Sequence, residues 1–183
     1  SITAKNTIYP LQILNDLTIV SSGRFKANGL DLTIGRSLFN YQPNDGFLHG
    51  AADGATQTTT FRGGGDGQVV GTSGSNVTFS TLVVNKPGAK LALGTSSNVL
   101  VEKLLDLSAG TLQDKGNTIT VKGDMKNTAV HESDANANTG VVFSGTVAQR
   151  VWSDVKGVFG NVGINNVKGV TFDDEFTINN RLK

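Results

Sequence analysis

Hydrophobic and polar residues alternate in short runs along most of the chain, and each run ends at Gly, Asn, Asp or Ser. Such runs occupy residues 17–20, 30–34, 81–84, 117–121 and 176–178. A period of two is typical of a β-strand that buries one side, because successive side chains point to opposite faces. The best candidate for a helix, 99–107, fits a period of two equally well. The pattern therefore predicts an all-β protein of many short strands, either a sandwich or a solenoid.

Internal repetition helps to choose between these two architectures. Alignment of the chain with itself places Ile34 on Val121 and Phe61 on Phe143, with an offset that drifts slowly along the chain. We infer two tandem units of roughly 80 residues. Because the chain starts at Ser1 and stops within a strand pattern, we expect it to be a piece of a longer protein. The expected boundaries are 13–100 and 101–177 for the two units, 1–12 for the end of a preceding unit and 178–183 for the start of a following one.

A continuous solenoid agrees better with the repeat than two small sandwich domains. Residues 94–104 contain no proline and continue the strand pattern, so no linker separates the units. If one coil takes about 20–25 residues, each unit makes three or four coils. We therefore expect a single parallel β-helix of about eight coils over residues 1–183. Side chains expected to point inward are Leu32, Ile34, Ile119 and Val121, together with Phe61, Phe79, Phe143, Phe159 and Phe172.

Composition agrees with this fold and excludes several classes of function. Gly accounts for 23 of 183 residues, and it accepts the left-handed backbone that tight corners require. Charged residues make up 17%, with 16 basic against 15 acidic, so no charge excess favours nucleic acid or an anionic membrane as a partner. No apolar run approaches the roughly 20 residues that span a bilayer. The lack of cysteine excludes disulfides, thiolate metal sites and a cysteine nucleophile.

Candidate chemistry is sparse. The densest acidic stretch, 173–175, alternates between faces, so we interpret it as a solvated turn and not as a catalytic cluster. No Gly-x-Ser-x-Gly elbow occurs. The only two histidines, His49 and His131, fall at equivalent places in the repeat. Three or four coils would separate them by roughly 14–19 Å, too far for one metal ion. We therefore expect no catalytic, cofactor-binding or metal-binding residue.

Calcium is the one ion that the acidic residues leave open. The candidate ligands are Asp45, Asp53 and Asp66, or Asp134 with Glu132. Calcium needs six to eight oxygen ligands, and stacked glycine-rich repeats can supply them. The glycine-rich run 63–67 occurs only once. We expect a plain glycine-rich corner there, and no cofactor.

Several segments resemble the tandem repeats of very large secreted surface proteins of Bacteroidota, including adhesins of gliding and attachment. The segments are 17–25, 105–112, 116–123, 140–152 and 159–172. The resemblance implies an extracellular or cell-surface protein exported by the type 9 route. It implies a non-enzymatic structural and adhesive role, as a rigid stalk that presents loops. The implied partners are a surface polysaccharide or another cell-surface protein, and neighbouring repeats of the same chain.

The longest irregular excursions, 41–58 and 126–140, are where we expect partner contacts. Trp152 breaks the aromatic repeat and is the aromatic residue expected to be exposed. An alternative function is that of a carbohydrate-active β-helix fragment that binds or cleaves polysaccharide. The candidate contact residues are Tyr41, Asn44, Asp45, His49, Asp53, His131, Glu132, Asp134 and Trp152.

Overall fold

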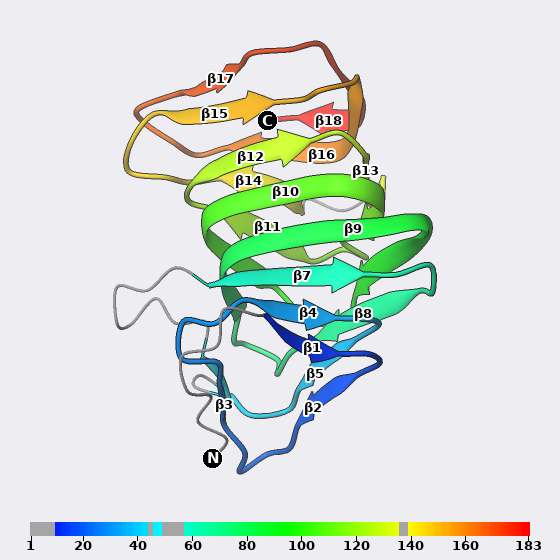
Figure 1. Cartoon of the computed structure of the whole chain (residues 1–183). Coiled ribbons are helices and arrows are strands. Elements are labelled where there is room, and N and C mark those ends of the chain that lie inside the picture. Colours follow the sequence, from blue (N-terminus) through cyan, green and yellow to red (C-terminus); the bar gives the residue numbers. More distant parts are fainter. Residues whose placement is uncertain (1–9, 44–45, 49–56, 136–138) are drawn as a thin grey trace.

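The computed structural model describes residues 10–43, 46–48, 57–135 and 139–183, which form a parallel β-helix of eight coils. Figure 1 shows the coils stacked from the N-terminal part at the bottom to the C-terminal part at the top. The strands pair in parallel, and the described residues contain no helix. None of them, accordingly, forms a helix long and apolar enough to cross a membrane. The predicted all-β solenoid of about eight coils is confirmed.

The strands form three faces, which we call A, B and C in the order in which the chain visits them. Face A contains β1 (Leu11–Ile13), β4 (Leu32–Ile34), β7 (Thr58–Arg62), the middle of β9 (Val77–Leu93) and of β10 (Val99–Gln113), β12 (Asp124–Asn127), β15 (Gln149–Trp152) and β17 (Val170–Phe172). Face B contains β2 (Leu17–Ile19), β5 (Leu38–Asn40), β8 (Gly67–Val70), the ends of β9 and β10, β13 (Val130–Glu132), and the starts of β16 (Gly157–Ile164) and β18 (Phe176–Leu182). Face C contains β3 (Phe25–Lys26), β6 (Phe47–Leu48), the starts of β9 and β10, β11 (Thr118–Val121), β14 (Gly140–Phe143) and the ends of β16 and β18.

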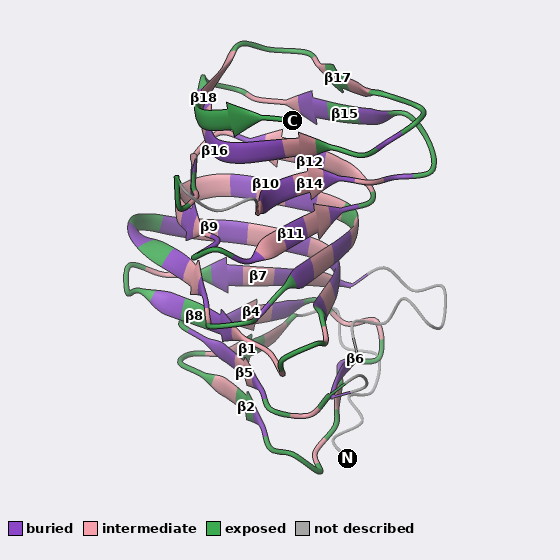
Figure 2. Cartoon of the chain, turned by 180° about the vertical axis from the view of Figure 1, so that it is seen from behind, coloured by how far each residue is buried: buried purple, intermediate pink, exposed green. Residues whose placement is uncertain are grey.

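Alternation along each strand sends one set of side chains into the coil and the other to solvent. Figure 2 shows this as buried segments that recur at the same place in successive coils. Burying apolar area in this way supplies the main driving force for folding. The expected inward residues Leu32, Ile34, Ile119 and Val121 are each at most 1% exposed, which confirms the prediction. Phe61, Phe79, Phe143 and Phe159 are fully buried, and Phe172 is half-buried against the same core.

Polar side chains at the corners connect each coil to the next. Asp31 Oδ1 accepts a hydrogen bond from the backbone N–H of Thr58 at 2.8 Å. Asn98 Oδ1 accepts one from Thr118 at 2.9 Å. These bonds satisfy backbone donors at the point where a strand starts, so the side chains act as caps. The same bond is made by Asp16 to Ser37, by Asp66 to Lys90 and by Asp124 to Arg150.

Corners differ in length, so the coils do as well. Leu105 pairs with Met125, 20 positions on, whereas Leu32 pairs with Thr59, 27 positions on. Where two corners stack closely, the backbone leaves no room for a side chain. At Gly110, φ is +85°, and a Cβ would lie 2.2 Å from the carbonyl oxygen of Lys86.

Residues aligned by the sequence repeat lie on different faces. Ile34 is on β4 of face A, whereas Val121 is on β11 of face C. Phe61 and Phe143 are divided between the same two faces. The alignment therefore relates strands of two faces and not strands stacked in one ladder. The division into units 13–100 and 101–177 stays a prediction.

Candidate functional site

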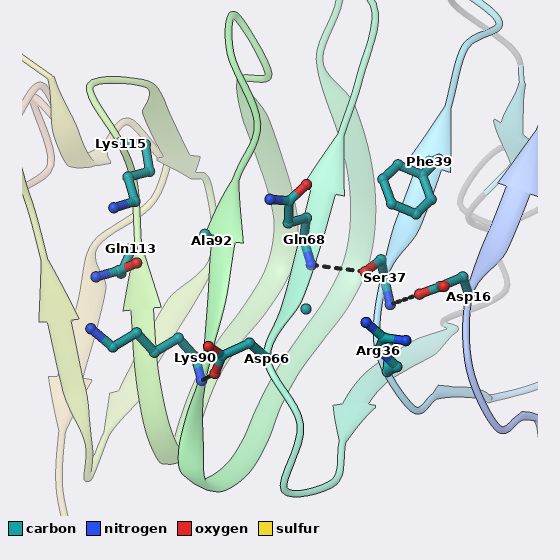
Figure 3. A pocket seen from close by; sticks show the side chains of 11 residues that line it. Asp16, Arg36, Ser37, Phe39, Asp66, Gln68, Lys90, Ala92, Gln113 and Lys115 are labelled. Carbon is teal, nitrogen blue, oxygen red and sulfur yellow. Dashed lines mark hydrogen bonds between the residues drawn. The ribbon is translucent and has the colours of Figure 1, made fainter.

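A groove runs across the outer surface of face B and encloses about 440 Å³. Figure 3 shows its side chains, which come from neighbouring strands of successive coils. Their positions follow from the alternation of the strands, because the inward residues between them form the core. We call this the face B groove; it is lined by Asp16, Arg36, Ser37, Phe39, Asp66, Gly67, Gln68, Lys90, Ala92, Gln113 and Lys115.

The floor of the groove is a row of outward residues held in register by the backbone. Gln68 pairs with Ala92, and Ala92 pairs with Gln113. The small side chain of Ala92 therefore lies between two long amides, which produces the hollow (Figure 3). The row continues to Glu132, whose carboxylate accepts a hydrogen bond from Gln113 Nε2. A smaller hollow of about 270 Å³ extends the groove past Gln113 toward Asp134.

Two aromatic rings lie at the N-terminal end of the groove. Phe39 lines it on β5, and Tyr41 follows on the same side two residues later. Their ring centroids are 6.2 Å apart and their planes differ by 13°. Tyr41 is 50% exposed. The pair thus provides an apolar surface that water reaches at Tyr41.

The charged groups in the groove are nearly balanced in sign. Arg36, Lys90 and Lys115 are exposed cations, and Asp16 and Asp66 are exposed carboxylates. Each carboxylate already caps the next coil through one oxygen, Asp16 on Ser37 and Asp66 on Lys90. Catalytic use of these carboxylates would compete with their structural role.

A buried polar cluster lies inside the coil behind the smaller hollow. His131 replaces an apolar residue in an inward ladder of face B, between Leu112 and Phe159. Its Nε2 lies 3.1 Å from Asp114 Oδ2, and both side chains are fully buried. The hydroxyl of Ser133 donates to the same carboxylate oxygen.

The cluster contains Ser, His and Asp but lacks the geometry of a nucleophilic triad. In a triad the imidazole bridges serine and carboxylate through its two nitrogens. Here His131 Nδ1 accepts the backbone N–H of Gly160 at 3.3 Å, so Nε2 carries the proton and donates it to Asp114. The Ser133 hydroxyl donates its hydrogen bond to the Asp114 carboxylate and not to the imidazole. The cluster is a satisfied internal network.

The hydrogen bonds also set the charge of Asp114. Burial alone would raise the pKa of its carboxyl group. Donors from His131, Ser133 and the backbone of Gly116 outweigh this effect and hold the pKa below its usual value. Asp114 is therefore a buried carboxylate that carries its negative charge at neutral pH.

The contact residues expected from the sequence have different environments. Tyr41, Glu132 and Asp134 are exposed, and Trp152 is half-buried on β15. His131, in contrast, is 1% exposed; its imidazole is used inside the coil and does not reach a partner's surface, which corrects that expectation. Asn44, Asp45, His49 and Asp53 lie outside the described residues.

The acidic turn and the glycine-rich corner behave as structural elements. Asp173 pairs with Arg150, Asp174 accepts the backbone N–H of Ser153, and Glu175 pairs with Lys156. The three carboxylates thus have separate partners, as the interpretation of a solvated turn requires. In the run 63–67, the one carboxylate caps the next coil. Among residues 10–43, 46–48, 57–135 and 139–183, no three His, Asp or Glu side chains are grouped as a metal site requires.

The face B groove and the buried cluster were both missed by sequence reasoning. Gln68, Ala92 and Gln113 are 24 and 21 positions apart, so only the coil lengths bring them into one row. A spacing of one coil between polar outward residues is the signal that would have found them. Comparison of the chain with protein-family models, with curated proteins and with solved structures found no match.

Proposed function

We propose that this chain is a non-enzymatic structural and adhesive segment of a large cell-surface or secreted protein. It acts as a rigid stalk and holds binding surfaces at fixed positions along its length. The observation that carries the proposal is the stack of eight coils, in which backbone pairing connects every coil to the next on faces A and B. On face C, β3 and β6 form a separate two-stranded sheet, and pairing continues from β9 onward. Such a stack is quasi-one-dimensional and presents an extended surface.

The proposal extends to the setting of the protein. The segment works outside the cell, after type 9 export, in gliding or attachment of a bacterium of the Bacteroidota. Its partners are a surface polysaccharide or another cell-surface protein, and neighbouring repeats of the same chain. The resemblance of its repeat pattern to such adhesins supports this setting. The near-balance of charge supports it further, because it favours neither nucleic acid nor an anionic membrane.

A distance measurement between the two ends of the stack tests the rigid stalk. The sequence has no cysteine, so Thr18→Cys and Thr177→Cys place two spin labels on face B of the first and last coils. Seven steps of about 4.8 Å predict a backbone separation of roughly 34 Å. A narrow distance distribution near that value is expected. A distribution as broad as that of a flexible chain would overturn the proposal.

A carbohydrate-active β-helix is the second candidate, favoured by the face B groove. Cleavage of a glycosidic bond normally needs two carboxyl groups on either side of it. In the groove, Asp16 and Asp66 are both used as caps, which favours binding over cleavage. Incubation with polysaccharides and measurement of new reducing ends decides between the two. Turnover that Asp66→Asn abolishes would establish the enzyme.

A further inference from the structure

We propose that the face B groove binds a neutral, hydroxyl-rich polysaccharide whose chain lies along the axis of the coil stack. The inference rests on the proposed adhesive role and deepens it, because it assigns contact to one face and names a class of ligand. It is drawn from the shape, the hydrogen-bonding groups, the charge balance and the aromatic pair of the groove.

The shape of the groove suits a chain that crosses the strands. Gln68, Ala92 and Gln113 occupy three successive coils in one outward row. Neighbouring strands are about 4.8 Å apart, a distance comparable with the length of one sugar unit in an extended glycan. The two amides are therefore about 10 Å apart and face alternate sugar units. The hollow above Ala92 takes the unit between them.

The hydrogen-bonding groups match hydroxyls. A side-chain amide offers both a donor and an acceptor, and a sugar hydroxyl needs both. The Gln68 side chain is exposed and makes no hydrogen bond to another described residue. Gln113 uses its Nε2 on Glu132, which leaves its carbonyl oxygen as an acceptor. Both amides can therefore bond a ligand without breaking contacts that hold the coils together.

The charge balance selects a neutral ligand. Three cations, Arg36, Lys90 and Lys115, stand beside two carboxylates, Asp16 and Asp66. In the same row, the Glu132 carboxylate lies 3.8 Å from Lys90 Nζ. A groove with interspersed charges has no strong field of one sign, so it does not attract a polyanion or a polycation. The same side chains still bond hydroxyl groups.

The aromatic pair supplies apolar contact at one end. The rings of Phe39 and Tyr41 are nearly parallel and follow each other along the direction of β5. Phe39 lines the groove, and Tyr41 extends the apolar surface to one side of it. The face of a pyranose ring that carries axial C–H groups is apolar and stacks on such a surface. Aromatic side chains contribute strongly to binding because they bury large areas with little loss of conformational freedom.

Affinity electrophoresis with defined polysaccharides tests the proposal. The neutral probes are mixed-linkage β-glucan, galactomannan and xyloglucan, and the charged probes are polygalacturonate and polyglutamate. We expect at least one neutral probe to retard the protein, with little change between low and high salt because no counterions are released. Retardation by none of the neutral probes would overturn the proposal. Equal or stronger retardation by both charged probes would also overturn it, since charge alone would then explain binding.

A pair of matched variants locates the site. Ala92→Trp fills the hollow on face B, whereas Val83→Trp places the same side chain on the outward side of face A in the same coil. Filling the hollow should weaken binding about tenfold or more, as loss of a central contact does. The Val83 variant should bind as the parent does, and Tyr41→Ala should weaken binding about as much as Ala92→Trp. Equal effects of the two Trp variants would place the site elsewhere.

Polysaccharide binding by the groove and rigidity of the coil stack are tested by separate measurements. The spin-label distance reports the stack whether or not any ligand binds. A narrow distance with no polysaccharide binding would overturn the groove inference and leave the rigid stalk in place. Near-parental circular dichroism of both Trp variants would show that any loss of binding is local.

Discussion

Lys86 and Gly35 are joined across two coils. The Nζ atom of Lys86, on the corner after the face A segment of β9, donates a hydrogen bond of 2.9 Å to the carbonyl oxygen of Gly35, on the corner after β4. The corner between them begins at Gly63, where a Cβ would lie 3.4 Å from the same oxygen. Lys86 is fully buried although its chain neighbours Pro87 and Gly88 are exposed. The buried Lys86 side chain thus reaches past the corner at Gly63 and hydrogen-bonds the corner at Gly35 from the interior of the coil.

The ionisation of Lys86 predicts a rise in stability at alkaline pH. Burial lowers the pKa of its ammonium group from 10.5, and the nearby Asp66 offsets this only in part. Between the folded and the unfolded pKa the unfolded chain binds more protons, so the free energy of unfolding rises with pH across that window. Urea unfolding from neutral pH to about 10.5 should show this rise in the parent and not in Lys86→Met. The exposed Lys168 provides the control, since Lys168→Met should keep the parental slope.

Two glycines of similar backbone geometry should respond differently to alanine. Gly110 and Gly116 have φ of +85° and +78°. A Cβ at Gly116 meets nothing within 4 Å, whereas at Gly110 it lies 2.2 Å from the Lys86 carbonyl oxygen. Gly116→Ala should cost about 1–2 kcal/mol, the strain of a left-handed residue. Gly110→Ala should cost about 4 kcal/mol or more, because the stacked corners must separate. Equal free energies of unfolding would contradict the close approach.

Removing the imidazole from the buried cluster should expose the cost of the Asp114 charge. In His131→Leu the carboxylate loses one of its donors, which should destabilise the fold by about 1.5–3 kcal/mol. Adding Asp114→Asn removes the buried charge and keeps an acceptor for Gly116. The double variant should therefore be more stable than His131→Leu alone. If the two losses simply add, the residues are not coupled and the network is wrong.

The same carboxylate should make the fold acid-sensitive. Because the folded-state pKa of Asp114 is lowered, the stability that it contributes is present above the unfolded value of 3.8. That stability is lost as the pH falls through the folded pKa. Acid titration followed by circular dichroism should show a steeper loss in the parent than in Asp114→Asn. Parallel titration curves would mean that the hydrogen bonds do not favour the charged form.

Local alternation allowed the fold class and the inward residues to be predicted. The pattern around Ile119 and Val121, for example, fixes which side chains face the core, because the period of a strand is two. Alternation does not say which strand lies above which, since that depends on the length of each coil, which varies from 19 residues (Thr111 to Val130) to 31 residues (Leu38 to Val69). Ile34 was accordingly aligned with a residue of another face. The burial of His131 and Lys86 was missed for the same reason, because their partners come from other coils.

Because the outward side chains are independent of the core, each of the three faces can display rows of side chains at a fixed spacing along the stack. The spacing between neighbouring side chains of a row is about 4.8 Å and is set by backbone hydrogen bonds, so it does not change with the side chain displayed. One such row on face A consists of Thr60, Val83 and Asp106. Another, on face B, consists of Gln68, Ala92 and Gln113. Substitutions can accumulate in one row while the sequences of the other rows stay unchanged. Chemical groups attached along one row would be displayed at a spacing that neither substitution of the side chains nor the solvent alters.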